Sequence, residues 1–217
     1  MPQNKQTKPE TPVKRTRRVQ ERAEITRAKL IKAGTVMFSE RGFDGVSVRD
    51  LENAAGVKRN LLAYHFDDKD TLWKRVTNDI YGLMKTEFDQ RLLISQKMSG
   101  RESLAFVVRF YVYFHARHPE LSRLVAQEAT QHSWRTQYMI EHHIRPATVA
   151  MEKLVKEIQG LDRDAFIHWY YIMISATSTI FSFAAECWDL FDVDPCEDGM
   201  VEDHADMLVS MLLGSDK

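Results

Sequence analysis

Between Ser47 and Phe66 the sequence predicts two short helices separated by one glycine. Ser47 can cap the first helix, and Asp50 lies three residues later, which is the spacing of a capping box. Gly56 ends that helix, and the second short helix is expected to open at residues 58–60. Two short helices joined by a glycine-containing turn form a helix-turn-helix, whose second helix enters the major groove of DNA.

A longer helix is predicted on each side of this unit. Residues 21–41 repeat apolar positions every three to four residues, and Gly42 is expected to end this helix in a left-handed conformation. Gly34 lies inside it and costs about 1 kcal/mol relative to Ala, so close packing is expected there. After the unit, a linking helix is predicted over 69–93, and one of the two aspartates just before it is the expected N-cap.

The remainder of the chain is also predicted to be helical, and its six Pro and nine Gly are few for a β-sandwich of 217 residues. We therefore expect an all-α protein. Its predicted parts are a disordered basic arm at 1–19, a helix-turn-helix domain at 20–66 and a helical domain at 67–217. The helices expected in the last part cover 102–116, 120–131, 134–159 with Pro146 kinking or dividing it, 163–190 and 201–213.

Charge is divided unevenly along the chain. Residues 1–75 hold 17 Lys and Arg against 10 Asp and Glu, whereas the formal net charge of the whole chain is −1. A basic first third on an acidic remainder is typical of a nucleic-acid-binding head on a body that avoids phosphate, although segregation by chance is the alternative. The arm alone holds six basic residues and one acidic residue, so it is expected to contact DNA phosphates.

Seven elements between Leu30 and Leu72 occur in a specific order and spacing: Phe38, Gly42, Val46-Ser47-Val48, Ala54-Ala55-Gly56-Val57, Tyr64-His65-Phe66, Lys69 and Leu72. This run is about a fifth of the chain, and it resembles the DNA-binding domain of the TetR family of bacterial transcriptional regulators. The family often has Thr or Ser and Tyr where this chain has Leu61 and Ala63. Arg49, Lys69 and the arm are therefore expected to make more of the phosphate contacts.

The resemblance implies a homodimer that binds a palindromic double-stranded operator, represses transcription and is released by a small ligand. Arginine pairs with guanine and asparagine with adenine, so base contacts are expected near the start of the second short helix. Lys69 is expected to meet phosphate. The residues predicted to contact DNA are Arg49, Lys58, Arg59, Asn60, Tyr64, His65 and Lys69.

Aromatic residues in the second part of the chain exceed what one helix face needs. They could be simple core, but the resemblance favours a cavity for a largely apolar or aromatic ligand with a polar end. The residues predicted to line it are Phe110, Tyr113, Phe114, Trp134, Tyr138 and Trp169.

Small residues near the middle of the expected helix 163–190 would let two backbones approach closely. With the last helix, they are expected to form a four-helix dimer interface, as in the family. The residues predicted to lie in this interface are Ser175, Ala176, Thr179 and Ser182.

Two other classes of function compete with this reading. A DNA-binding dimer could be controlled by a partner protein instead of a ligand. An enzyme is disfavoured because no nucleophile-elbow motif is present, and no cofactor or catalytic residue is predicted. Four histidines could in principle bind zinc, but solvated or pocket-edge histidines are the favoured interpretation, so no metal is predicted. These are His115, His118, His142 and His143.

The sequence also predicts a cytoplasmic location. No apolar run reaches 18 residues without charge, so no membrane span is expected. The first 18 residues contain no apolar core of a secretory signal. Cys187 and Cys196 suit a reducing compartment better than a disulfide scaffold.

Overall fold

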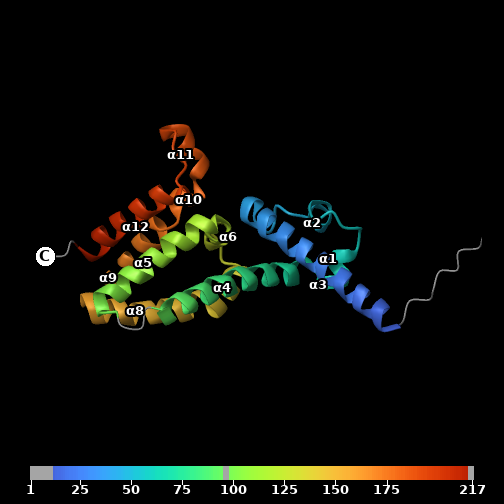
Figure 1. Ribbon diagram of the computed structural model, residues 1–217, viewed down its shortest axis with the longest axis horizontal. Helices are drawn as coiled ribbons and strands as arrows, with labels where there is room; N and C mark the ends of the chain where they lie inside the picture. Colours follow the sequence, from blue (N-terminus) through green and yellow to red (C-terminus); the bar gives the residue numbers. More distant parts are fainter. Residues whose placement is uncertain (1–11, 95–97, 215–217) are drawn as a thin grey trace, which may run out of the picture.

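The computed structural model describes residues 12–94 and 98–214, and all regular structure within them is helical (Figure 1). The predicted all-α class is confirmed. The N-terminal head contains α1 (Pro12–Arg41), α2 (Val48–Ala54) and α3 (Leu61–Phe66), and α4 (Lys69–Ile94) links it to a helical body. The body contains α5 (Gly100–Arg117), α6 (Pro119–Ala129), α7 (Trp134–Met139), the π-helix η1 (Ile140–Ile144), α8 (Arg145–Gln159), α9 (Arg163–Ala176), α10 (Thr179–Ser182), α11 (Ala184–Phe191) and α12 (Asp198–Leu213).

The predicted helix-turn-helix is present, and its local signals act as expected. Ser47 Oγ accepts a hydrogen bond from the Asp50 backbone N–H at 3.1 Å, and the Asp50 carboxylate accepts from the Ser47 N–H at 3.1 Å. This capping box is the one predicted. Gly42 and Gly56 end α1 and α2 with φ of 68° and 61°. Asp68 caps α4 by accepting from the Thr71 N–H at 2.7 Å.

Two boundaries in the head differ from those expected. The second short helix begins at Leu61, not at residues 58–60, because Asn60 has a left-handed φ of 66° that breaks the helix before it. The arm was expected to be disordered to residue 19, but α1 already begins at Pro12. Proline suits the first helical turn, and the Lys, Arg, Gln and Glu residues that follow have high helix propensity. Residues 1–11 lie outside the described part of the chain.

The single helix expected over 163–190 is also wrong, since α9, α10 and α11 occupy this stretch. The hydroxyls of Thr177 and Ser178 both donate to the Ile174 carbonyl, at 3.2 and 2.7 Å. Such local side-chain bonds compete with the helical ladder and end α9 here. Pro146 divides the segment 134–159 as predicted, with η1 immediately before it.

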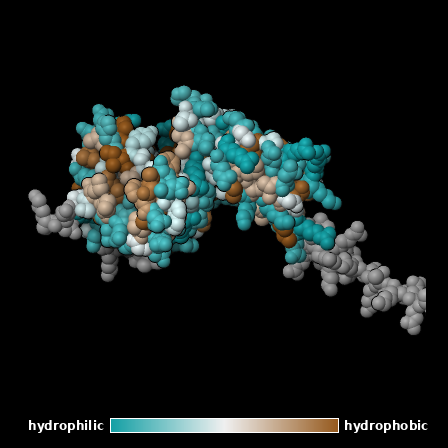
Figure 2. All heavy atoms as spheres, turned by 90° about the horizontal axis from the view of Figure 1, so that it is seen from above, coloured by the Kyte–Doolittle hydropathy of each residue, from teal (hydrophilic) through white to brown (hydrophobic). Residues whose placement is uncertain are grey.

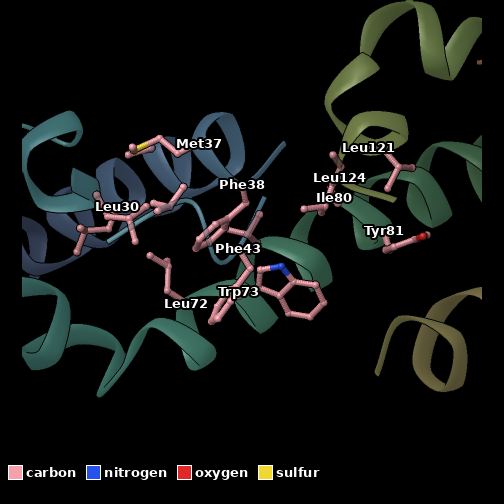
Figure 3. Close-up of a cluster of buried hydrophobic side chains, with 14 of the residues drawn as sticks. Leu30, Met37, Phe38, Phe43, Leu72, Trp73, Ile80, Tyr81, Leu121 and Leu124 are labelled. Carbon is pink, nitrogen blue, oxygen red and sulfur yellow. The ribbon is translucent and has the colours of Figure 1, made fainter. Parts of the chain in front are cut away.

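One hydrophobic cluster runs from the head into the body. Its buried residues come from α1, α2, α3, α4, α5, α6 and α7 and the turn after α1, and Figure 3 shows part of it, from Leu30 to Tyr81 and Leu124. A second cluster lies within the body among α5, α8, α9, α10 and α12. The boundary predicted after residue 66 therefore falls inside a shared core, so the head packs directly against the body. None of the helices in the described residues is long and apolar enough to cross a membrane.

Close contact between α1 and α4 explains the glycine that interrupts the apolar face of α1. A Cβ on Gly34 would lie 3.0 Å from Val76 Cγ2 and 3.6 Å from Leu72 Cδ2. Without that space the two helices could not approach as closely.

Two helical glycines should therefore respond in opposite directions to substitution. Gly34→Val should lower the free energy of unfolding by about 1–3 kcal/mol, because it overpacks the α1–α4 contact. Gly82 is exposed on α4, and a Cβ added there would have no atom within 4 Å, so Gly82→Ala should raise the free energy of unfolding by about 1 kcal/mol through helix propensity. Urea denaturation measures both, and a stabilising Gly34→Val would contradict the packing.

Candidate nucleic-acid interface and internal cavity

The second short helix exposes one face of the head. Leu62 and Phe66 are buried at 1% and 3% exposure, whereas Tyr64 is 77% exposed on the opposite side of α3. The turn before α3, residues 58–60, is fully on the surface, and Arg49 is exposed near the start of α2. Of the predicted DNA-contacting residues of α2, α3 and the turn between them, only His65 is half-buried, and the others are exposed.

Two contacts that the sequence did not reveal hold α3 in place. Glu52 is 5% exposed, and its carboxylate accepts from the Leu62 N–H at 3.0 Å, which joins α2 to the start of α3. Arg27 of α1 donates to the His65 carbonyl at 3.0 Å and lies 4.9 Å from the centre of the Phe66 ring. Burial, and then the charge of Arg27, lower the pKa of His65. The neutral form of His65 is therefore favoured.

Lys69 is held by the head itself. Its ammonium donates to the carbonyls of Phe43 and Val46, at 3.0 and 2.9 Å, and lies 3.8 Å from the centre of the Phe43 ring. Two of its three N–H donors are therefore used inside the protein. The phosphate contact predicted for Lys69 stays a prediction, with one donor left to make it.

The body contains a cavity, partly open to solvent, in two adjoining lobes of about 450 and about 300 Å³. The first lies among α4, α5, η1 and α8, and the second among α4, α5, α6, η1, α8, α9 and α10. Of the six residues predicted to line a cavity, only Phe110 lines one of these two lobes. This volume is within the range of small-molecule sites.

The other five predicted lining residues lie elsewhere for separate reasons. Phe114 is fully buried in the shared cluster, and Trp169 is buried in the second cluster. The Tyr113 hydroxyl bonds to Glu202 of α12. Trp134 and Tyr138 lie on α7 and pack edge-to-face on Trp73, at 5.3 and 6.2 Å between ring centres. The high content of aromatic residues therefore indicated residues of the core and of the junction between head and body, and it was a poor predictor of residues that line the cavity.

The polar groups of the cavity belong to residues outside the six that were predicted from the sequence to line it. Tyr81, Tyr111 and His143 line both lobes, and His115 lines the second. Tyr81 stacks on His143 with 4.6 Å between ring centres and an interplanar angle of 2°. Burial raises the pKa of the phenols of Tyr81 and Tyr111, and it lowers the pKa of His115 to about 4. These groups are neutral at pH 7.

Helix α7 joins the body to the head. Arg135 is 8% exposed and forms ion pairs with Glu128 at 2.7 Å and with Asp44 at 3.1 Å. Its guanidinium also lies 4.4 Å from the centre of the Phe43 ring. Trp134 meets the same ring edge-to-face at 6.1 Å. Since α7 continues directly into η1, the helix that contacts the head is contiguous with a wall of the cavity.

The residues predicted for the dimer interface do not form one exposed stripe. Ser175 and Thr179 are exposed and line the second lobe of the cavity, whereas the Ala176 carbonyl bonds His204 Nε2 at 2.9 Å and the Ser182 Oγ is buried. The breaks after α9 and α10 turn these positions in different directions. Large apolar side chains are instead exposed on α9, α11 and α12 and just before α11: Ile167, Tyr171, Ile172, Phe183, Trp188, Leu190, Phe191, Met207 and Met211.

This exposed set is called the apolar face below. Figure 2 shows hydrophobic residues on the part of the body seen from above, the side on which α11 and α12 lie in Figure 1. The histidines form no comparable site: within the described residues, no three His, Cys, Asp or Glu side chains are placed to hold a metal ion.

Comparison with known sequences gives two family matches. Residues 30–76 match the family described as bacterial regulatory proteins, tetR family, and residues 101–212 match one described as a tetracyclin repressor-like C-terminal domain. Among curated relatives, the probable HTH-type transcriptional regulator YttP of Bacillus subtilis is 30% identical over 48% of this chain and 51% of its own length. The HTH-type transcriptional repressor NicS of Pseudomonas putida is 31% identical over 50% of each chain. The chain spans about half the length of the curated relatives it matches.

Solved structures share the fold over most of the chain. The structure of AibR in complex with isovaleryl coenzyme A and operator DNA aligns with a TM-score of 0.68 at 17% identity, over 88% of this chain and all of that one. The fatty acid degradation regulator FadR from Bacillus halodurans aligns with a TM-score of 0.63 at 16% identity, over 93% and 97% of the two chains. At these identities the likeness shows the fold.

Two lysines of the head, Lys58 and Lys69, should respond differently when their charge is removed. Lys69→Met should lower the free energy of unfolding by about 1.5–3 kcal/mol, because it removes charged hydrogen bonds to two carbonyls. Lys58 is exposed without such bonds, so Lys58→Met should change stability by less than about 0.5 kcal/mol. Chemical denaturation of both variants measures this, and equal stabilities would show that Lys69 is not a structural tie.

Proposed function

The chain belongs to the TetR family of bacterial regulatory proteins, and on that premise we propose that it is a ligand-responsive repressor that binds a palindromic operator as a homodimer. The observation that carries the DNA-binding part is the exposed face formed by residues 58–60 and Tyr64 on a helix-turn-helix held rigidly by Glu52 and Arg27. Such a face places basic and amide side chains where they can meet base edges. A regulator of this kind acts in the cytoplasm, and no catalysis is assigned to it.

The homodimer is proposed to form through the apolar face. Exposed Tyr, Trp, Phe, Ile and Met side chains on neighbouring helices are unusual on a monomer and typical of an interface. A two-fold axis there would present two α3 helices to two half-sites, so the operator would be a palindrome.

The cavity favours control by a small ligand over control by a partner protein. Tyr81 of α4 and His143 of η1 both line it and stack on each other. A ligand that separates or tilts this pair would move α4 and η1, and η1 continues α7, which is ion-paired to the head through Arg135 and Asp44. Release of DNA then requires that the ligand bind more tightly to the state whose heads do not fit the operator.

Substitution of Arg59 tests the DNA-binding proposal. Arg59→Ala should weaken binding by about 1–3 kcal/mol on an operator selected from random duplexes, and it should relax the preference at one base of each half-site. Arg163→Ala removes the same charge from the start of α9 in the body and should leave binding unchanged. Gel shifts on selected and random duplexes provide the measurement. A uniform loss on every sequence would make Arg59 a phosphate contact.

The proposed interface is tested by two arginine substitutions at equally exposed sites. Ile172 on α9 belongs to the apolar face and is 59% exposed, whereas Val149 on α8 does not belong to it and is 60% exposed. Ile172→Arg should convert the dimer to a monomer and weaken operator binding, because it buries two unpaired charges at the two-fold axis. Val149→Arg should remain dimeric. Sedimentation of both variants as dimers would place the interface elsewhere.

A further inference from the structure

The chemistry of the cavity indicates what kind of molecule it accepts. Its two lobes adjoin, because Tyr81, Met84, Tyr111, His143 and Ala147 line both. Most of the remaining wall is apolar, including Phe88, Phe110, Met151 and Leu154 in the first lobe and Val125 and Ile174 in the second. A ligand that fills both lobes therefore needs a hydrocarbon or aromatic skeleton.

Two hydroxyls that line the cavity, those of Tyr81 and Ser122, have no hydrogen-bond partner among the described residues. Tyr81 is 7% exposed, and its hydroxyl has no hydrogen bond to any other described residue. Figure 3 shows this hydroxyl pointing away from the rest of the hydrophobic cluster. Buried hydroxyls almost always have a partner, so the buried, unpartnered Ser122 Oγ points to a polar group of a bound molecule, and the Tyr81 hydroxyl is open to the same cavity.

His115 adds a hydrogen-bond acceptor to the second lobe. Its Nδ1 lies 3.3 Å from the Thr177 carbonyl, and since a carbonyl only accepts, Nδ1 carries the proton. Burial lowers the pKa of His115 to about 4, so the ring is neutral at pH 7 and Nε2 keeps a free lone pair. No described residue donates to that atom. A ligand hydroxyl or N–H is the natural donor.

Among the described residues that line the cavity, the one lysine, Lys85, is largely exposed to solvent and is already paired with a carboxylate. Of the residues that line it, Lys85 and Asp89 carry full charges, and they pair with each other at 2.6 Å with side chains 75% and 53% exposed. Burial also lowers the pKa of His143, which disfavours its charged form. A carboxylate taken into these lobes would lose its hydration without gaining a cation.

We propose that the cavity selects uncharged ligands, in which an apolar or aromatic skeleton carries an oxygen that accepts from the Tyr81 hydroxyl or a hydroxyl that donates to His115 Nε2. Carboxylates of the same skeleton are rejected. This inference rests on the proposed ligand-responsive function and specifies the chemical class of its ligand.

A matched pair of probes tests this selection on the full-length protein. 4-Hydroxybiphenyl is neutral at pH 7, whereas biphenyl-4-carboxylate has the same skeleton and one negative charge. Equilibrium dialysis at pH 7 should give at least tenfold tighter binding of the phenol. Tyr81→Phe should weaken binding of the phenol about fivefold, the effect of one neutral hydrogen bond. Tyr113→Phe is the control, because the Tyr113 hydroxyl bonds Glu202 and does not line the cavity.

Three results would overturn the inference, and they separate it from the proposed function. Equal or tighter binding of the carboxylate would overturn the selection for neutral ligands and leave ligand-responsive repression standing. Equal effects of Tyr81→Phe and Tyr113→Phe on binding of the phenol would show that the ligand accepts no hydrogen bond from the Tyr81 hydroxyl. Binding of neither probe would overturn the inference together with the ligand-responsive part of the function, while operator binding by the same preparation would still support the DNA-binding part.

Discussion

Trp73 is the residue on which the arrangement of head and body depends. It lies fully buried near the start of α4 and packs edge-to-face on Trp134 and Tyr138 of α7. It belongs to the same cluster as Phe43, which follows α1 in the head. Because the head and the body share this core, α4 is not a free hinge between two separate domains. A rotation of the head would have to separate well-packed aromatic rings.

The same core extends from the DNA-binding head to the cavity. Tyr81 belongs to the cluster and also lines both lobes, and its ring is stacked on His143 of η1. From η1 the chain continues back into α7, where Arg135 is paired with Asp44 of the head. Two routes therefore join the cavity to the head: α4 continues the chain of the head, and α7–η1 contacts the head through the Arg135–Asp44 ion pair. Coupling requires such an element with two arrangements, each favoured by one ligand.

Local sequence signals predicted the helix-turn-helix. They did not predict features that depend on tertiary contacts, such as the exact start of α3 and the position of the Lys69 side chain. The capping box at Ser47 and Asp50 depends on residues three apart, so it can be read from the chain. The start of α3 depends on a left-handed Asn60, which the sequence permits but does not require. The bonds of Lys69 to two carbonyls more than 20 residues away carry no local signal.

The cavity was harder to predict than the head for a related reason. Aromatic residues are large and fill a core, so Phe114 and Trp169 became core residues. Part of the lining came from α4, which the sequence indicates only as a link, and part from η1, whose π-helical turn before Pro146 was not predicted. The shape of a cavity depends on how several helices pack together, so the apolar pattern of a single helix does not predict it.

The central claim is that occupation of the cavity and binding of DNA are coupled through α4 and α7. Linkage requires operator DNA to change the affinity for a cavity ligand by the same factor by which that ligand changes operator affinity. The direct measurement is the dissociation constant of a cavity ligand with and without saturating operator, for the wild type and for Arg135→Ala. We predict that operator weakens ligand binding about fivefold or more in the wild type and by a smaller factor in the variant. Equal dissociation constants with and without operator in the wild type would contradict the account.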